Sequence, residues 1–85
     1  MKRRRLLERL RRGHHENVGF REFCRLVEAF GFHLQRMEGS HRAYDHPRVP
    51  IFLNLQPRRG EAKGYQVRQF LRLIEEYNLR MEDER

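Results

Sequence analysis

Apolar residues follow a helical period at both ends of this chain and an alternating period in the middle. From Gly19 to Phe30 they recur at intervals of three and four, which predicts a helix. Asn17 is expected to cap its N-terminus, and Gly31 stands where a left-handed C-terminal cap belongs. From Tyr65 the helical period returns. Its apolar stripe is Val67, Phe70, Leu71, Ile74 and Tyr77.

Between these helices, apolar and polar residues alternate, which is typical of β-strands. We expect strands at residues 32–37, 41–46 and 51–55, a turn at 38–40, and an interruption of pairing at 47–50, which begins and ends with proline. Short connections force the strands into an antiparallel meander, and both helices must then cover one face of it. The predicted fold is α+β, a two-layer α-β-β-β-α arrangement with a three-stranded antiparallel sheet.

The segment before this domain carries three leucines at helical spacing among arginines, Leu6, Leu7 and Leu10. This spacing predicts a short basic N-terminal helix, and a solvated basic arm is the simpler interpretation that we favour. The chain accordingly divides into a basic arm or short helix at 1–16, the folded domain at 17–79, and an acidic polar tail at 80–85.

The charge of the chain is strongly positive and unevenly distributed. Nineteen Lys and Arg residues oppose twelve Asp and Glu residues, for a net charge of +7, and seven of the basic residues lie within residues 2–12. Such a balance favours a polyanionic partner. No apolar stretch approaches the roughly 18 residues that span a bilayer, and the first residues lack the apolar region of a signal peptide. We therefore expect a cytoplasmic protein with no membrane partner.

Cysteine and histidine usage argues against metal or disulfide chemistry. Cys24 is the only cysteine, so the chain has neither an intramolecular disulfide nor a Cys-x-x-Cys zinc site. Its position within an apolar helical stretch predicts a core residue. The five histidines show no metal-ligand spacing and have no nearby acidic cluster. We expect no metal and no cofactor.

His41, which follows Gly39 and Ser40, is the best candidate for chemistry. Histidine can give or take a proton near neutral pH, and arginine matches two phosphate oxygens with its planar fork. Arg36 and Arg42 are the nearest arginines in sequence, and Lys63 lies where the last helix begins. Free backbone N–H groups at a helix start favour phosphate, although a solvated loop lysine explains Lys63 equally well.

The face of the sheet that His41 occupies depends on the turn before it. A two-residue turn at 39–40 places His41 on the side of Arg36, whereas a three-residue turn places it on the side of Met37. The sequence leaves both arrangements open.

From Phe20 to Leu79 the sequence resembles the HicA toxins of bacterial and archaeal toxin-antitoxin pairs. The landmarks are Phe30-Gly31-Phe32, Arg36-Met37-Glu38-Gly39-Ser40-His41 with Tyr44, the strand 51–55, and Lys63-Gly64-Tyr65-Gln66-Val67. Gly-Ser-His alone would be a weak signal. Its weight comes from its place after a helix and one strand, and before two strands and a closing helix.

This resemblance implies a fold similar to the double-stranded RNA-binding domain and an mRNA-cleaving endoribonuclease that blocks translation. It also implies a HicB-like antitoxin that covers the active histidine, with the toxin a monomer when free and part of a larger complex when neutralised. The family's catalytic histidine falls on His41, and the two residues before it match Gly39 and Ser40. Tyr44 matches the family's aromatic position. Arg42 occupies a position that the family varies.

The expected site therefore has His41 as general acid or base, without metal, and an RNA-binding set composed of Arg36, Gly39, Ser40, Arg42 and Lys63. The alternative is a non-catalytic RNA-binding module of the double-stranded type. Such a module needs a lysine cluster at the start of its second helix, where this chain has only Lys63 and, farther along, Arg68. The N-terminal segment could add an RNA contact or dock on an acidic patch of the antitoxin.

Overall fold

The computed structural model describes residues 2–82, and within them it contains three helices and one three-stranded antiparallel sheet. The strands lie in the order β1-β2-β3, so β2 is central. The elements are α1 (Lys2–Arg11), α2 (Phe20–Ala29), β1 (His33–Glu38), β2 (His41–His46), β3 (Val49–Leu55) and α3 (Gly64–Glu76).

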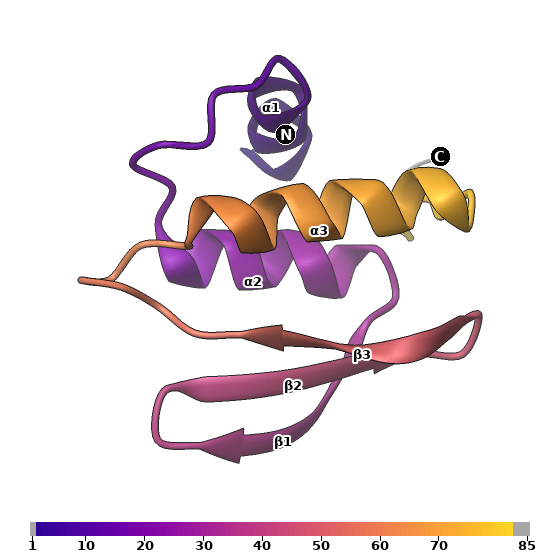
Figure 1. Ribbon diagram of the computed structural model, residues 1–85. Helices are drawn as coiled ribbons and strands as arrows, with labels where there is room; N and C mark the ends of the chain where they lie inside the picture. The colour runs from indigo at the N-terminus through magenta and orange to yellow at the C-terminus, as the bar shows by residue number, and fades with distance from the viewer. Residues whose placement is uncertain (1, 83–85) are drawn as a thin grey trace.

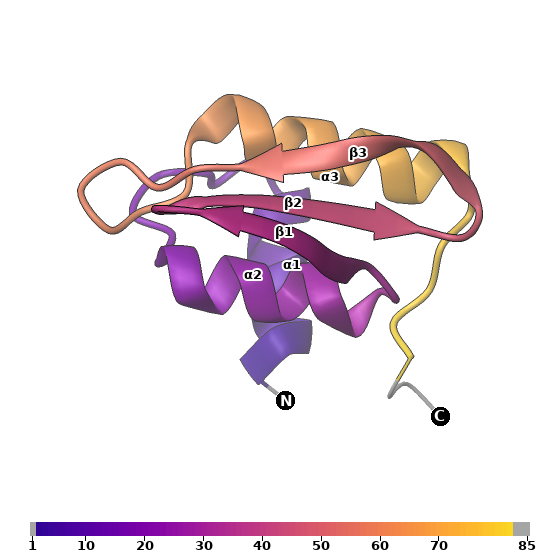
Figure 2. The same cartoon turned by 90° about the horizontal axis from the view of Figure 1, so that it is seen from below.

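Helices α2 and α3 lie side by side over one face of the sheet, and the other face is left open (Figures 1 and 2). Helix α1 lies on the outer side of this helical pair, away from the sheet (Figure 1). The α+β prediction is therefore confirmed, including the antiparallel meander and the short basic helix at the N-terminus.

The core is centred on Phe70 of α3. Its ring makes edge-on contacts with three other phenylalanines, and the centroid distances are 5.5 Å to Phe23, 5.4 Å to Phe30 and 6.1 Å to Phe32. Edge-to-face packing aligns the positive edge of one ring with the negative face of another. These contacts join both helices to the chain that enters the sheet.

Helix α2 ends as predicted but begins later than predicted. Gly31 has a φ of 95°, the left-handed conformation expected after a helix C-terminus. The N-cap is Gly19 rather than Asn17, so that prediction is wrong. The reason is a tertiary contact: the Ala62 N–H donates to the Val18 carbonyl over 2.8 Å, and this pairing holds the chain extended up to Gly19.

The first hairpin has a two-residue turn. Glu38 pairs with His41, so Glu38 belongs to β1 and the turn contains only residues 39–40. Gly39 has a φ of 58°, as the first central residue of a type II′ turn requires. Of the two arrangements left open by the sequence, His41 therefore takes the side of Arg36.

Strand β3 is longer than predicted, because pairing resumes directly after Pro47 and Arg48. Val49 pairs with His46, and Pro50 lies within the strand. Proline is tolerated there because β3 is an edge strand, where a residue can do without a ladder N–H. The expected interruption over residues 47–50 is thus confined to a two-residue turn.

The N-terminal segment is a docked helix and not a solvated arm. Leu10 is fully buried and Leu7 nearly so, and both belong to the same core as α2 and α3. The segment after α1 is tied down by the Arg9 guanidinium, which donates to the carbonyl of Glu16. The apolar stripe, rather than the dense positive charge, determines where α1 lies.

The chain after α3 also packs against the core. Met81 is buried, and the N–H of Glu82 donates to the carbonyl of Ala29 over 2.6 Å. Up to residue 82 this segment is therefore not a free polar tail. Residues 83–85 of the predicted acidic tail lie outside the described residues.

Candidate active site

His41 lies at the start of β2 on the open face of the sheet, in a hollow of about 430 Å³. The pairing of Arg36 with Ala43 and of Ala43 with Asn54 places these residues on the same face as His41. All three strands contribute to the hollow. Its lining is Arg36, Glu38, His41, Arg42, Ala43, Phe52 and Asn54.

A hydrogen-bonded chain links His41 to the start of α3 through Gln56. The Nε2 atom of His41 lies 2.8 Å from Gln56 Oε1, and Nζ of Lys63 lies 3.4 Å from the same oxygen. Lysine offers only donors, so this oxygen accepts, and His41 Nε2 must be the protonated nitrogen. In a neutral ring, Nδ1 then holds the lone pair, and nothing within residues 2–82 hydrogen-bonds to it.

Gln56 is held in place by a buried side chain of α3. Its backbone N–H donates to Oε1 of Gln66 over 3.2 Å, and Gln66 is only 2% exposed. The amide of Gln66 also donates to the hydroxyl of Tyr65 over 3.3 Å. The ring of His41 is therefore oriented through Gln56 by the helical layer.

Gln56 is the site residue that sequence reasoning missed. Because Arg42 pairs with Leu55, the next residue of the β3 chain comes opposite His41. That relation depends on a shift in the register of the second hairpin between Tyr44 and His46. The turn at Pro47 and Arg48 alone would place Asn54 opposite His41. Because an irregularity of this kind leaves no local pattern, the position of Gln56 could not be read from the sequence.

Arg36 and Phe52 give the hollow a cation and an aromatic ring. Arg36 pairs with Ala43 across the ladder, on the face that carries His41. Phe52 is 49% exposed although it is large and apolar, so its ring is open to a ligand. Glu38, which pairs with His41, places one carboxylate at the turn end of the hollow. Gly39 and Ser40 form the turn beside His41, and they are not among the residues that line the hollow.

Arg42 borders the hollow, but its guanidinium lies on the helix-covered side. It donates to the Tyr44 hydroxyl over 3.3 Å and lies 5.6 Å from the centroid of the Phe20 ring. The Tyr44 hydroxyl in turn donates to Glu28 over 2.7 Å. The hydrogen bond with Tyr44 raises the pKa of Arg42, and burial raises the pKa of Tyr44 well above its ordinary value. The structure does not bring this arginine to His41.

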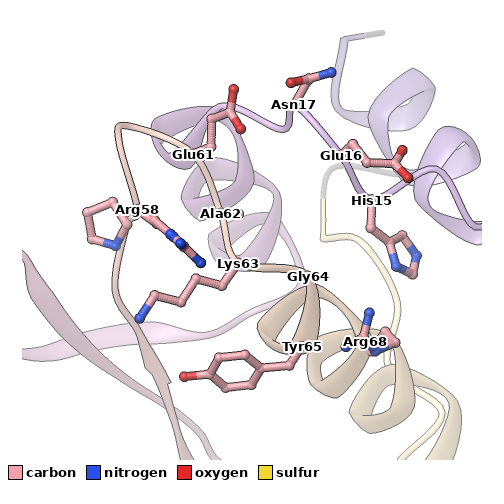
Figure 3. Close-up of a pocket in the computed structure, with 11 residues that line it drawn as sticks. His15, Glu16, Asn17, Arg58, Glu61, Ala62, Lys63, Gly64, Tyr65 and Arg68 are labelled. Carbon is pink, nitrogen blue, oxygen red and sulfur yellow. The ribbon is translucent and has the colours of Figure 1, made fainter.

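A second, larger hollow of about 850 Å³ lies at the start of α3. Figure 3 shows Lys63 and Tyr65 extending to one side of this segment, toward the strands, with Arg68 and His15 on the far side of Gly64. Lys63 lines this hollow and also reaches Gln56 beside His41. Its side chain therefore links the start of α3 to the Gln56 oxygen that His41 also contacts.

Other titratable groups are engaged in holding the fold. His46 lies 3.1 Å from the carbonyl of Phe30, and His15 lies 2.9 Å from that of Leu10. Cys24 is buried, and this burial raises the pKa of its thiol. Over the described part of the chain, no three His, Cys, Asp or Glu side chains are grouped to hold a metal ion. Within the same residues, no helix is long and apolar enough to cross a membrane.

The fold and the site define a small α+β protein whose open sheet face carries one oriented histidine. A family model for the HicA toxin of bacterial toxin-antitoxin matches residues 20–75, which is more than half of the 85-residue chain. The chain belongs to this family. It is the toxin of a toxin-antitoxin pair, so its partner is an antitoxin. Neither the curated proteins nor the solved structures contain a match.

Proposed function

We propose that this toxin is a metal-independent endoribonuclease that cleaves mRNA and so blocks translation, with His41 as its general acid or base. The observation that carries the proposal is the hydrogen bond from His41 Nε2 to Gln56, because it fixes the ring and leaves Nδ1 for proton exchange with a substrate. The open hollow around His41 gives an RNA strand access to that atom.

RNA supplies its own nucleophile, the 2′-hydroxyl next to each phosphate. A neutral His41 can accept the 2′-hydroxyl proton at Nδ1 as the oxygen attacks phosphorus. A protonated ring can donate from the same atom to the departing 5′-oxygen. Each such transfer contributes roughly 10²- to 10⁴-fold to the rate.

The extra negative charge on phosphorus requires cations that a strand on this face can reach. Arg36 shares the face of His41, and Lys63 is held 3.4 Å from the oxygen that His41 also contacts. We assign phosphate binding to these two residues, with Gly39 and Ser40 shaping the turn. Arg42 leaves the RNA-binding set, because its guanidinium is engaged by Tyr44.

An exposed aromatic ring in the same hollow favours a single-stranded substrate. Phe52 is half exposed and lines the hollow with His41, so an unstacked base can rest on its ring. A base within a duplex could not reach it. We propose unstructured mRNA as the substrate, and a HicB-like antitoxin that covers this face as the inhibitor.

The test is cleavage of an unstructured, end-labelled RNA by the purified toxin in excess EDTA. Attack by the 2′-hydroxyl predicts a 2′,3′-cyclic phosphate on the 5′ fragment. A 2′-deoxy substitution at the cleaved position is expected to abolish that cut and leave cuts elsewhere unchanged. Cleavage of the deoxy position, or activity only with divalent metal, would contradict the mechanism. Tight binding with no cleavage would favour the RNA-binding module instead.

A further inference from the structure

The strongest positive charge of this protein lies outside both the family match and the proposed active site. Residues 2–12 contain seven Lys and Arg residues and one acid, whereas the family match begins at residue 20. Helix α1, which holds most of this charge, lies on the far side of the helical layer from the sheet (Figure 1). The charge therefore forms a surface separate from that of His41.

Part of this surface is a groove between α1 and α2, where four of the seven cations meet two charged residues of α2. It has a volume of about 700 Å³ and is lined by Lys2, Arg3, Arg5, Leu6, Arg9, Glu22 and Arg25. Five of these seven residues are cations, and one is an acid. Lys2 and Arg5 are both exposed and lie one helical turn apart, on the same side of α1.

The groove is part of the folded protein and is not a flexible arm. Leu7 and Leu10 anchor α1 in the core, and Arg9 donates to the carbonyls of Glu16 and Asn17. A cation held on an anchored helix loses less conformational entropy on binding than one on a disordered segment. The charges of α1 are thus arranged before any partner arrives.

The composition of the groove favours nucleic acid over protein as its occupant. Protein interfaces centre on apolar and aromatic side chains and are depleted of charge at that centre. This groove has one leucine and no aromatic residue among its lining. Interfaces with nucleic acids are more polar and much more positive, and arginine binds phosphate oxygens in pairs.

We propose that the groove between α1 and α2 binds the sugar-phosphate backbone of a second segment of RNA, separate from the strand at His41. The choice of RNA rests on the proposed function, which places RNA on the opposite face of the molecule. We expect the groove to bind RNA without sequence preference, because it contacts phosphates and these are the same in every RNA. The toxin holds an RNA here while the sheet face takes the strand to be cut.

The test measures binding of a fluorescent, single-stranded 2′-O-methyl RNA as a function of salt. This RNA has no 2′-hydroxyl nucleophile, so binding is measured whether or not the protein is a nuclease. Each phosphate contact contributes roughly 0.7 to the slope of log affinity against log salt. Lys2→Gln with Arg5→Gln is therefore expected to reduce the slope by about 1.4. Lys2→Arg with Arg5→Lys is expected to keep it.

The matched control is Arg72→Gln with Arg80→Gln, which removes the same charge at two exposed positions outside the groove. It is expected to leave the slope unchanged. Equal slopes for the groove variant and the unmodified protein would overturn the proposal. The proposal would also be overturned if the groove variant kept the slope for RNA but lost binding to poly-L-glutamate. That result would identify an acidic protein as the occupant of the groove. Circular dichroism verifies that each variant is folded.

Discussion

The two faces of β2 carry neighbouring residues, His41 and Arg42, whose side chains have different surroundings. His41 lies in an open hollow with its ring oriented by Gln56, while the guanidinium of Arg42, one residue later, is engaged by Tyr44 and the ring of Phe20. Successive strand residues point to opposite sides of the sheet. One strand therefore carries the proposed catalytic histidine on one face and a residue that contributes to stability on the other, and substitutions should separate the two.

The largest expected difference between the faces is in stability. Tyr44 is fully buried, so Tyr44→Ala is expected to lower the free energy of unfolding by about 3–5 kcal/mol, as for other large aromatic truncations. Phe52→Ala is the matched control, an aromatic truncation on the open face, and should cost less than about 1 kcal/mol. Urea denaturation measures both. Equal losses would contradict the division between the faces.

The next largest effect concerns the orientation of His41. Gln56→Leu removes the acceptor of the His41 N–H, and a misplacement of about 1 Å can lower a rate by roughly a hundredfold. Gln56→Glu keeps an acceptor and is expected to retain more activity than Gln56→Leu. Single-turnover cleavage of the RNA used above measures both rates. Equal rates for the two variants would show that Gln56 does not act through this hydrogen bond.

The smallest expected effect is a pH dependence of stability from the covered face. Burial raises the pKa of Tyr44 in the folded protein, so an unfolded tyrosine, with a pKa of about 10, ionises first. This contribution is complete below pH of about 10 and is lost as the pH rises further. Tyr44→Phe should flatten the alkaline decline measured by urea titration. If the stability of Tyr44→Phe declined as steeply at alkaline pH as that of the unmodified protein, the decline would come from other titratable groups.

The sequence was sufficient for the elements and their order, because their signals are local. The helical stripe around Phe70 and the glycine at 31 depend only on nearby residues, and both appear where expected. The alternation rule could also have excluded Arg42 as a partner of His41 in a regular strand.

Features that depend on tertiary contacts could not be read from the sequence. The pairing of β1 with β2 slips between Leu34 and Arg36, so Leu34 pairs with the buried Tyr44 although Arg36 lies on the open face. A bulge of this kind leaves no local pattern. The position of α1 could not be predicted for the same reason. The spacing of its leucines predicts a helix, but it does not indicate which part of the protein those leucines pack against.

The central claim is that His41 transfers the proton in RNA cleavage, and comparing two histidine variants tests it most directly. His33 is exposed on β1, so His33→Ala is the matched control for His41→Ala. In excess EDTA, His41→Ala is expected to lower the cleavage rate by about 10²- to 10⁴-fold with an unchanged melting temperature. His33→Ala is expected to cleave at the normal rate. Full activity of a folded His41→Ala protein would contradict the account.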